Sequence, residues 1–158
     1  MALTTDIAVR DAELRKLAAE EPTLKQLTAI PGVGPIVSFA FMLCIDDPHR
    51  FKDSRDVGAY LGLRPTLRSS GEVSRQGRIT RRGDPYLRTL LIQAAHASLR
   101  SKTDSHLKRF GEGLEARLGR KKAVIALARK LAVLMHRLWV TGAPYQATYG
   151  RLGTPAST

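Results

Sequence analysis

The strongest folding signal in this sequence is a helical repeat of apolar residues near its C-terminal end. Apolar side chains recur every three or four positions between residues 120 and 141, and Gly142 and Pro144 follow. That spacing places them on one face of an α-helix, and a glycine followed by a proline commonly ends a helix. The sequence therefore predicts a long helix over residues 120–141 whose buried face comprises Val124, Leu127, Ala128, Leu131, Leu134, Met135 and Leu138.

Helical spacing continues through most of the remaining chain. It predicts shorter helices over residues 23–29, 35–46, 53–61 and 84–101, the last of them opened by Asp84 as N-cap and by Pro85. Residues 64–83, rich in Arg, Ser and Gly, lack this spacing and predict a short hairpin or an ordered loop. We expect a mainly α, compact helical domain over residues 22–146. A weakly amphipathic helical tail, the possible end of a coiled coil, precedes it over 1–21, and a flexible tail follows over 147–158.

Length and composition indicate one globular domain. The 158 residues suit a single core, and an apolar share of 43% is ordinary for such a protein. Cys44 is the only cysteine, so a disulfide framework and a cysteine-rich zinc site are excluded, and a reducing cytoplasm fits. No window approaches the roughly 18 apolar residues of a spanning helix, and no signal peptide is recognisable. We expect a cytoplasmic protein with no membrane partner.

Charge is distributed unevenly along the chain. Residues 1–63 carry seven Lys/Arg and nine Asp/Glu, a net charge of −2, whereas residues 64–158 carry 19 and five, a net charge of +14. A strongly basic half is suited to a polyanion, because each neutralised phosphate releases counterions. The charge therefore favours nucleic acid as the partner. An anionic membrane surface is the rival polyanion, and no specific feature supports it.

The segment from Leu27 to Ile36 has the pattern of a helix-hairpin-helix. Residues 30–35 read Ile-Pro-Gly-Val-Gly-Pro, in which the glycines are Gly32 and Gly34, and a predicted helix lies on each side. Such glycines permit a tight turn with accessible backbone amides, which can bind a phosphate without reading a base. The alternative is a plain turn between two packed helices. The Pro-Gly-Val-Gly-Pro context favours phosphate contact, whereas acidic residues on the C-terminal side of this segment favour a structural role.

The Arg-rich segment contains two adjacent serines, Ser69 and Ser70, followed by Gly71. A serine hydroxyl surrounded by fixed positive charge could attack a phosphodiester, because the anionic transition state would be stabilised there. Alternatively, the serines only donate hydrogen bonds to phosphates. The candidate phosphate-binding cations of this segment are Arg64, Arg68, Arg75, Arg78, Arg81 and Arg82.

A second basic surface is predicted on the polar side of the helix over 120–141. It includes Lys121, Lys122, Arg129 and Lys130, which either form a solvated face or contact phosphates. Aromatic residues do not alternate with these cations, so backbone contact is favoured over base stacking.

The remaining polar residues predict no metal site. Asp53 and Asp47 precede predicted helix or turn residues, where N-capping and turn formation are favoured over Mg²⁺ binding. The four histidines show no metal-ligand spacing, and His106 falls in what we expect to be a polar linker.

Several short motifs, taken in order, resemble one family. They are 30–35 (IPGVGP), 50–55 (RFKDSR), 59–63 (AYLGL), 69–71 (SSG), 77–83 (GRITRRG), 86–88 (YLR) and 126–132 (ALARKLA). Together they resemble the C-terminal transposase domain of the serine-nucleophile insertion-sequence transposases, the family numbered one hundred and ten, also called RNA-guided bridge recombinases. The resemblance covers roughly residues 24–145.

The resemblance implies a catalytic serine before a glycine, which matches Ser70, with Ser69 as second choice. It further implies DNA and a structured guide RNA as partners, assembly as a homo-oligomer, and Mg²⁺ held by an acidic, RuvC-like N-terminal domain. This chain has no counterpart of that domain and no cofactor of its own, so we expect it to bind nucleic acid but not to cut it alone. The alternative function is a non-catalytic module that binds nucleic-acid backbone.

Overall fold

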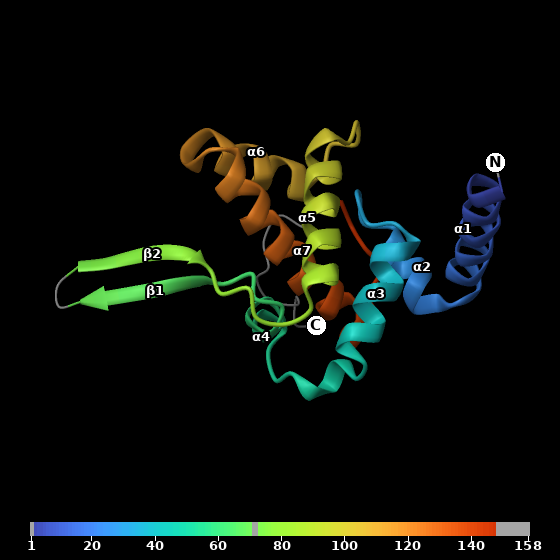
Figure 1. The fold of residues 1–158 in the computed structure, drawn as a ribbon, viewed down its shortest axis with the longest axis horizontal. Coiled ribbons are helices and arrows are strands. Elements are labelled where there is room, and N and C mark those ends of the chain that lie inside the picture. The colour runs from blue at the N-terminus through green and yellow to red at the C-terminus, as the bar shows by residue number, and fades with distance from the viewer. Residues whose placement is uncertain (1, 71–72, 148–158) are drawn as a thin grey trace, which may run out of the picture.

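The computed structural model describes residues 2–70 and 73–147, and this part of the chain is mainly α-helical (Figure 1). The prediction of a mainly α domain with one hairpin is confirmed. In chain order the elements are α1 (Ala2–Glu20), α2 (Pro22–Thr28), α3 (Pro35–Ile45), the 3₁₀ turn η1 (Pro48–Arg50), α4 (Ser54–Tyr60), β1 (Pro65–Ser70), β2 (Val73–Ile79), α5 (Pro85–Arg100), α6 (His106–Leu118) and α7 (Arg120–Thr141).

Helix α7 is the centre of the fold. Helices α2, α4, α5 and α6 all pack against it, and every residue of its predicted apolar face is buried. Each buried Leu or Met contributes roughly 1.5–3 kcal/mol to stability. The helix ends as predicted, because Gly142 adopts a left-handed conformation (φ 67°) and its amide donates to the Leu138 carbonyl oxygen at 2.9 Å.

Aspartates cap the starts of three elements. The Asp84 carboxylate accepts a hydrogen bond from the Leu87 amide at 2.7 Å, Asp53 accepts one from Arg55 at 2.8 Å, and Asp47 accepts one from His49 at 2.9 Å. The predicted N-cap role of Asp53 is confirmed. No group of three potential metal-binding side chains comes together in the part of the chain that the structure describes.

A buried histidine joins α7 to the start of α4. His136 is 1% exposed. Its Nε2 donates to the Pro48 carbonyl oxygen at 2.7 Å, which leaves Nδ1 to accept from the Ser54 hydroxyl at 2.9 Å. Both polar atoms of the imidazole are satisfied, so this side chain stabilises the core.

Helix α6 was not predicted, and the polar linker expected around His106 is wrong. His106 is the first residue of α6, and the Ser105 hydroxyl caps the helix by accepting from the Lys108 amide at 3.2 Å. Two glycines lower the helix propensity of this segment. Gly111 is nevertheless required, because a Cβ there would lie 2.6 Å from Leu99 Cδ2 and 3.0 Å from Leu127 Cδ2.

Strands β1 and β2 form an antiparallel hairpin that extends away from the helices, and Figure 1 shows it at the opposite end of the molecule from α1. A β-bulge opposes Gly77 and Arg78 to the single residue Thr66, whose hydroxyl donates to the Arg78 carbonyl oxygen at 2.9 Å. Bulges increase strand twist and redirect a hairpin. Of the two alternatives for residues 64–83, the hairpin is confirmed.

Helix α1 is attached mainly through its C-terminal end. Ala18 is its buried residue, whereas Leu3, Ile7 and Leu17 are exposed. The predicted helical tail is present; its membership of a coiled coil, like the division into domain and tails, stays a prediction. Most of the tail expected over 147–158 lies outside the described residues. None of the described helices is both long enough and apolar enough to cross a bilayer.

Candidate nucleic-acid interface

The two candidate nucleophiles occupy the last positions of β1. In the strand register Ser70 pairs with Val73, and Ser69 pairs with Ser74. These pairs are the farthest from the helical body, at the distal end of the hairpin (Figure 1). Gly71, expected to lend flexibility beside the serines, lies outside the described residues.

The candidate arginines follow the whole length of the hairpin. Arg68 and Arg75 are register partners near its distal end, and Arg78 lies at the bulge. The side chains of Arg64, Arg78, Arg81 and Arg82 are exposed. Within the described side chains, none of these four lies within ion-pair distance of a carboxylate. The hairpin therefore presents cations whose charge the described protein does not neutralise.

The base of the hairpin is closely packed where the chain enters and leaves it. Gly62 (φ 70°) and Gly83 (φ 81°) are both left-handed, and a Cβ on either would overlap backbone atoms of the opposite segment, Arg82 for Gly62 and Tyr60 for Gly83. The Arg81 amide donates to the Gly62 carbonyl oxygen at 3.1 Å. The segments 59–63 and 77–83, recognised as separate motifs in the sequence, thus meet at one joint.

The two glycines of the α2–α3 turn have different surroundings. Gly32 (φ 89°) lies against α5, and a Cβ there would overlap Ala94 and Ser98. The Ser98 hydroxyl reinforces this contact by donating to the Pro31 carbonyl oxygen at 2.5 Å. Gly34 has an ordinary extended conformation, and a Cβ there would meet nothing within 4 Å. Packing therefore explains the glycine at position 32, whereas no contact of this kind requires a glycine at position 34.

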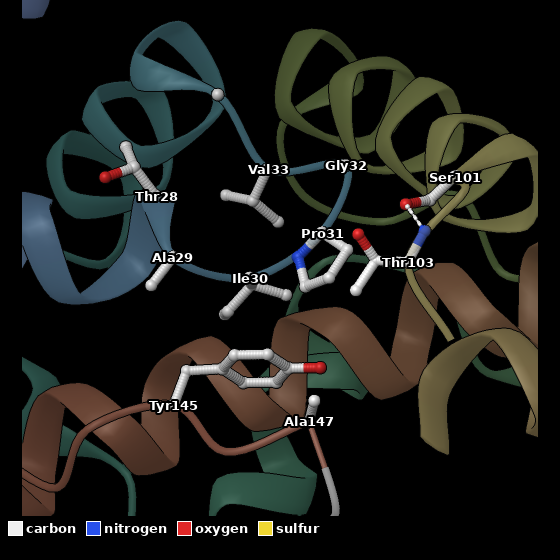
Figure 2. A pocket seen from close by; sticks show the side chains of 11 residues that line it. Thr28, Ala29, Ile30, Pro31, Gly32, Val33, Ser101, Thr103, Tyr145 and Ala147 are labelled. Atoms are coloured by element: carbon white, nitrogen blue, oxygen red, sulfur yellow. Dashed lines mark hydrogen bonds between the residues drawn. The ribbon is translucent and has the colours of Figure 1, made fainter. Parts of the chain in front are cut away.

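An open hollow of about 550 Å³ lies beside this turn (Figure 2). Its other walls come from the end of α5 and from the segment after α7, which includes Tyr145. That segment is held in place, because Gln26 donates to the Ala143 carbonyl oxygen and the His106 amide donates to that of Ala147 at 2.9 Å. Burial raises the pKa of Tyr145, and the nearby Ser105 hydroxyl opposes the rise. None of the described residues that line the hollow carries a charged side chain, so among these residues a phosphate would find amides and hydroxyls as its donors.

The basic residues of α7 fall into two groups. Lys121 and Lys122 are exposed in its first turn, and no described carboxylate lies within ion-pair distance of either. Arg129 and Lys130 are half-buried: the Arg129 stem covers Gly58 in α4, and Lys130 Nζ lies 3.8 Å from the centre of the Phe110 ring.

Lys130 also contacts the imidazole of His106, with 3.2 Å between Nζ and Nε2. Burial lowers the pKa of the Lys130 ammonium. Burial, Lys130 and Arg109, in that order, lower the pKa of His106, so the imidazole accepts a hydrogen bond from the ammonium in its neutral form. Lys130 is thus held inside the α6–α7 contact, whereas Lys121 and Lys122 are accessible to a polyanion.

Comparison with known proteins identifies the chain. Residues 24–112 match the model of the Transposase IS116/IS110/IS902 family. The chain belongs to this family. The matched residues include the α2–α3 turn, the hairpin, α5 and the start of α6.

Curated relatives extend the similarity beyond the family match. A Sinorhizobium fredii protein named as a transposase (y4pF/y4sB) is 36% identical over 155 residues, which cover 96% of this chain and 40% of the relative. The transposase for insertion sequence element IS1111A of Coxiella burnetii is 36% identical over 141 residues, covering 86% and 38%. A Pseudomonas aeruginosa protein named as a family 20 transposase is 35% identical over 139 residues, covering 86% and 41%. The chain spans about two fifths of the length of these relatives.

Proposed function

We propose that this transposase chain binds DNA and supplies the nucleophilic serine for transposition, together with a RuvC-like domain. Ser70 is the nucleophile, and Ser69 is the second choice. One observation carries the proposal: in a member of a transposase family, both serines are at the distal end of a projecting hairpin. The described arginines at its base and bulge, Arg64, Arg78, Arg81 and Arg82, are exposed, with no described carboxylate within ion-pair distance.

The reaction follows from the chemistry of a serine hydroxyl. A bond forms between Ser70 Oγ and the phosphorus of a DNA phosphodiester, the bond from phosphorus to the 3′ oxygen breaks, and that oxygen takes a proton. The product is a phosphoserine linked to a 5′ DNA end, with a free 3′-OH that can later attack to rejoin a strand. The arginines stabilise the negative charge that develops on the phosphate oxygens.

The proton of the serine hydroxyl must pass to a base. We assign that base to the RuvC-like domain, where Mg²⁺ would be bound and would make a hydroxyl easier to deprotonate. The described residues bring no carboxylate cluster together, so we assign no Mg²⁺ site to this chain. The chain alone is therefore expected to bind nucleic acid without cleaving it.

Charge placement supports a polyanionic ligand. Arg68 and Arg75 are opposed in the hairpin, and like charges at opposed positions destabilise an antiparallel pair. Lys121 and Lys122 are at the N-terminus of α7, where the helix dipole disfavours cations. Bound phosphates would offset both costs, which favours DNA, and the structured guide RNA implied by the family resemblance, as ligands.

The nucleophile can be tested with the RuvC-like domain of a relative, a guide RNA and Mg²⁺ supplied to the chain. We expect Ser70→Ala to abolish a detergent-resistant protein–DNA adduct and strand joining, with DNA affinity nearly unchanged, and Ser69→Ala to retain both reactions. If Ser70→Ala still joins strands, Ser70 is not the nucleophile. If neither substitution matters, the chain is a non-catalytic module that binds nucleic-acid backbone.

We also propose that the chain self-associates through α1. Its Leu3, Ile7 and Leu17 side chains are 78%, 59% and 51% exposed, respectively, which is unfavourable for apolar groups in water. Light scattering of the chain and of a Leu3→Ser/Ile7→Ser variant tests this. A native chain that is monomeric at high micromolar concentration would contradict it.

A further inference from the structure

Arg88, the fourth residue of α5, connects that helix to the base of the hairpin. Its Nη1 donates to the Leu61 carbonyl oxygen at 3.2 Å and to the Arg82 carbonyl oxygen at 3.0 Å. Leu61 lies just before the chain enters β1, and Arg82 lies just after it leaves β2. One guanidinium nitrogen therefore holds both ends of the hairpin.

The position of Arg88 is not explained by helix stability. A cation near the N-terminus of a helix is disfavoured by the helix dipole. Side chains on a helix point toward its N-terminus, which here is the end adjoining the hairpin base. Hydrogen bonds from a charged donor to a carbonyl oxygen are stronger than neutral ones, so the two bonds compensate for that position.

The hairpin depends on this joint for its direction. The two strands make their substantial contacts with each other, and no helix packs along them. At this joint the close approach of Gly62 to Arg82 and the bond from the Arg81 amide to Gly62 hold the two ends of the hairpin together. On the entry side the joint is attached to the helical body by the buried Leu61 and Leu63, and the Leu63 amide donates to the Gly58 carbonyl oxygen of α4 at 3.0 Å. Arg88 adds the link from α5 to both ends. A small rotation at this joint would move the distal serines by a much larger distance.

We propose that Arg88 is a positioning residue that fixes the direction of the hairpin and thereby places Ser70 against the scissile phosphate. The part concerning Ser70 rests on the proposed function; the part concerning hairpin direction does not.

Hairpin direction can be measured without nucleic acid. Spin labels at Leu67→Cys on β1 and Gln93→Cys on α5, both exposed positions, report their separation by double electron–electron resonance in a Cys44→Ala background, which removes the only native cysteine. Arg100→Ala is the matched control, because it removes the same charge from the other end of α5. We expect a narrow distance distribution for the native residue and for Arg100→Ala, and a broader or shifted one for Arg88→Ala.

A native-like narrow distribution for Arg88→Ala would overturn the proposal. If Arg88→Ala does not fold, Arg88→Gln is measured instead, because the shorter glutamine amide reaches fewer of the Leu61 and Arg82 carbonyl oxygens. A broader distance distribution for Arg88→Gln supports the proposal, and an unchanged distribution overturns it.

The consequence for function is measured in the adduct assay. Arg88→Ala should lower the rate of adduct formation at least tenfold while DNA affinity changes no more than in Arg100→Ala. Equal rates in the two variants would overturn the positioning role. A native chain that neither binds DNA nor forms the adduct would refute the proposed function, and the distance measurement would still decide the role of Arg88 in hairpin direction.

Discussion

At the scale of single residues, the role of a side chain in this protein depends on what surrounds it more than on its chemical type. Gly32 and Gly34 are two residues apart in one motif, yet Gly32 is enclosed by α5 and Gly34 faces open space. Lys122 and Lys130 are both lysines of α7, but Lys130 is half-buried against Phe110, whereas Lys122 is exposed. Substitutions at such pairs separate packing from ligand binding.

We expect Gly32→Ala to destabilise the fold and Gly34→Ala to leave it intact. The first forces a Cβ into Ala94 and Ser98 at a left-handed φ of 89°, which should cost more than about 2 kcal/mol. Urea unfolding measures this difference. If Gly34 contacts a phosphate, Gly34→Ala will weaken DNA binding in a folded protein; unchanged affinity would remove the α2–α3 turn from the interface.

The burial of His106 and its contact with Lys130 should make the free energy of unfolding depend on pH. Because the pKa of His106 is lowered in the folded state, the unfolded chain binds a proton first as pH falls below about 6.5. Stability is therefore highest above that pH and is lost as pH falls through the folded pKa. The melting midpoint should decrease between pH 7.5 and 5.5, and decrease less in His106→Gln. An equal decrease in both proteins would show that other groups are responsible.

At the scale of secondary-structure elements, close backbone contacts decide where elements join. The α6–α7 contact needs Gly111, and the hairpin base needs Gly62 and Gly83. These joints connect segments far apart in sequence, so the local pattern of each segment gives little indication of them. The hairpin itself has few contacts outside its base. The rigidity of its orientation relative to the helices therefore depends on the packing around Gly62 and Gly83.

Gly62→Ala is expected to be much more damaging than Gly142→Ala. Both glycines are left-handed, with φ of 70° and 67°. The backbone strain of an alanine should therefore lower the free energy of unfolding by about 1–2 kcal/mol at either position. A Cβ at Gly142 meets nothing within 4 Å, whereas at Gly62 it overlaps Arg82. Thermal unfolding of the two variants isolates the steric part of the effect. Equal midpoints would mean that the hairpin base can open without cost.

At the scale of the whole molecule, shape and charge are arranged along one axis. Helix α1, which belongs to the half with net charge −2, lies at one end, and the arginine-rich hairpin lies at the other. The exposed lysines of α7 add to the cations of the basic half. This separation favours one orientation of the molecule on a polyanion.

DNA binding by the chain should depend steeply on salt. If roughly six phosphates are neutralised, affinity for a short duplex should fall about a thousandfold between 50 and 200 mM salt. The double variant Lys121→Gln/Lys122→Gln should reduce the slope of log K against log salt by about 2. Arg15→Gln/Lys16→Gln on α1 removes the same charge from the other end and should leave the slope unchanged. Fluorescence anisotropy measures both, and equal slopes in the two variants would exclude α7 from the interface.

Much of the helical framework could be predicted because it depends on local patterns. The apolar repeat of α7 and the Asp84-Pro85 start of α5 each act through neighbours within a few residues. Helix α6 could not be predicted, because its glycine content argues against a helix until Leu99 and Leu127 are known to pack on Gly111. His136 and Arg88 were missed for the same reason, since their partners are 88 and 27 residues away in sequence.

The order of residues alone determined the helical class, the basic half and the family resemblance, since periodicity, charge and motif order need no coordinates. The tertiary structure decided which glycine of the α2–α3 turn has room for a side chain, which lysines of α7 are exposed, and how the hairpin is joined to α5. These outcomes depend on contacts between segments that are distant in sequence. Such contacts contribute to the free energy of folding only when the other helices have packed against α7.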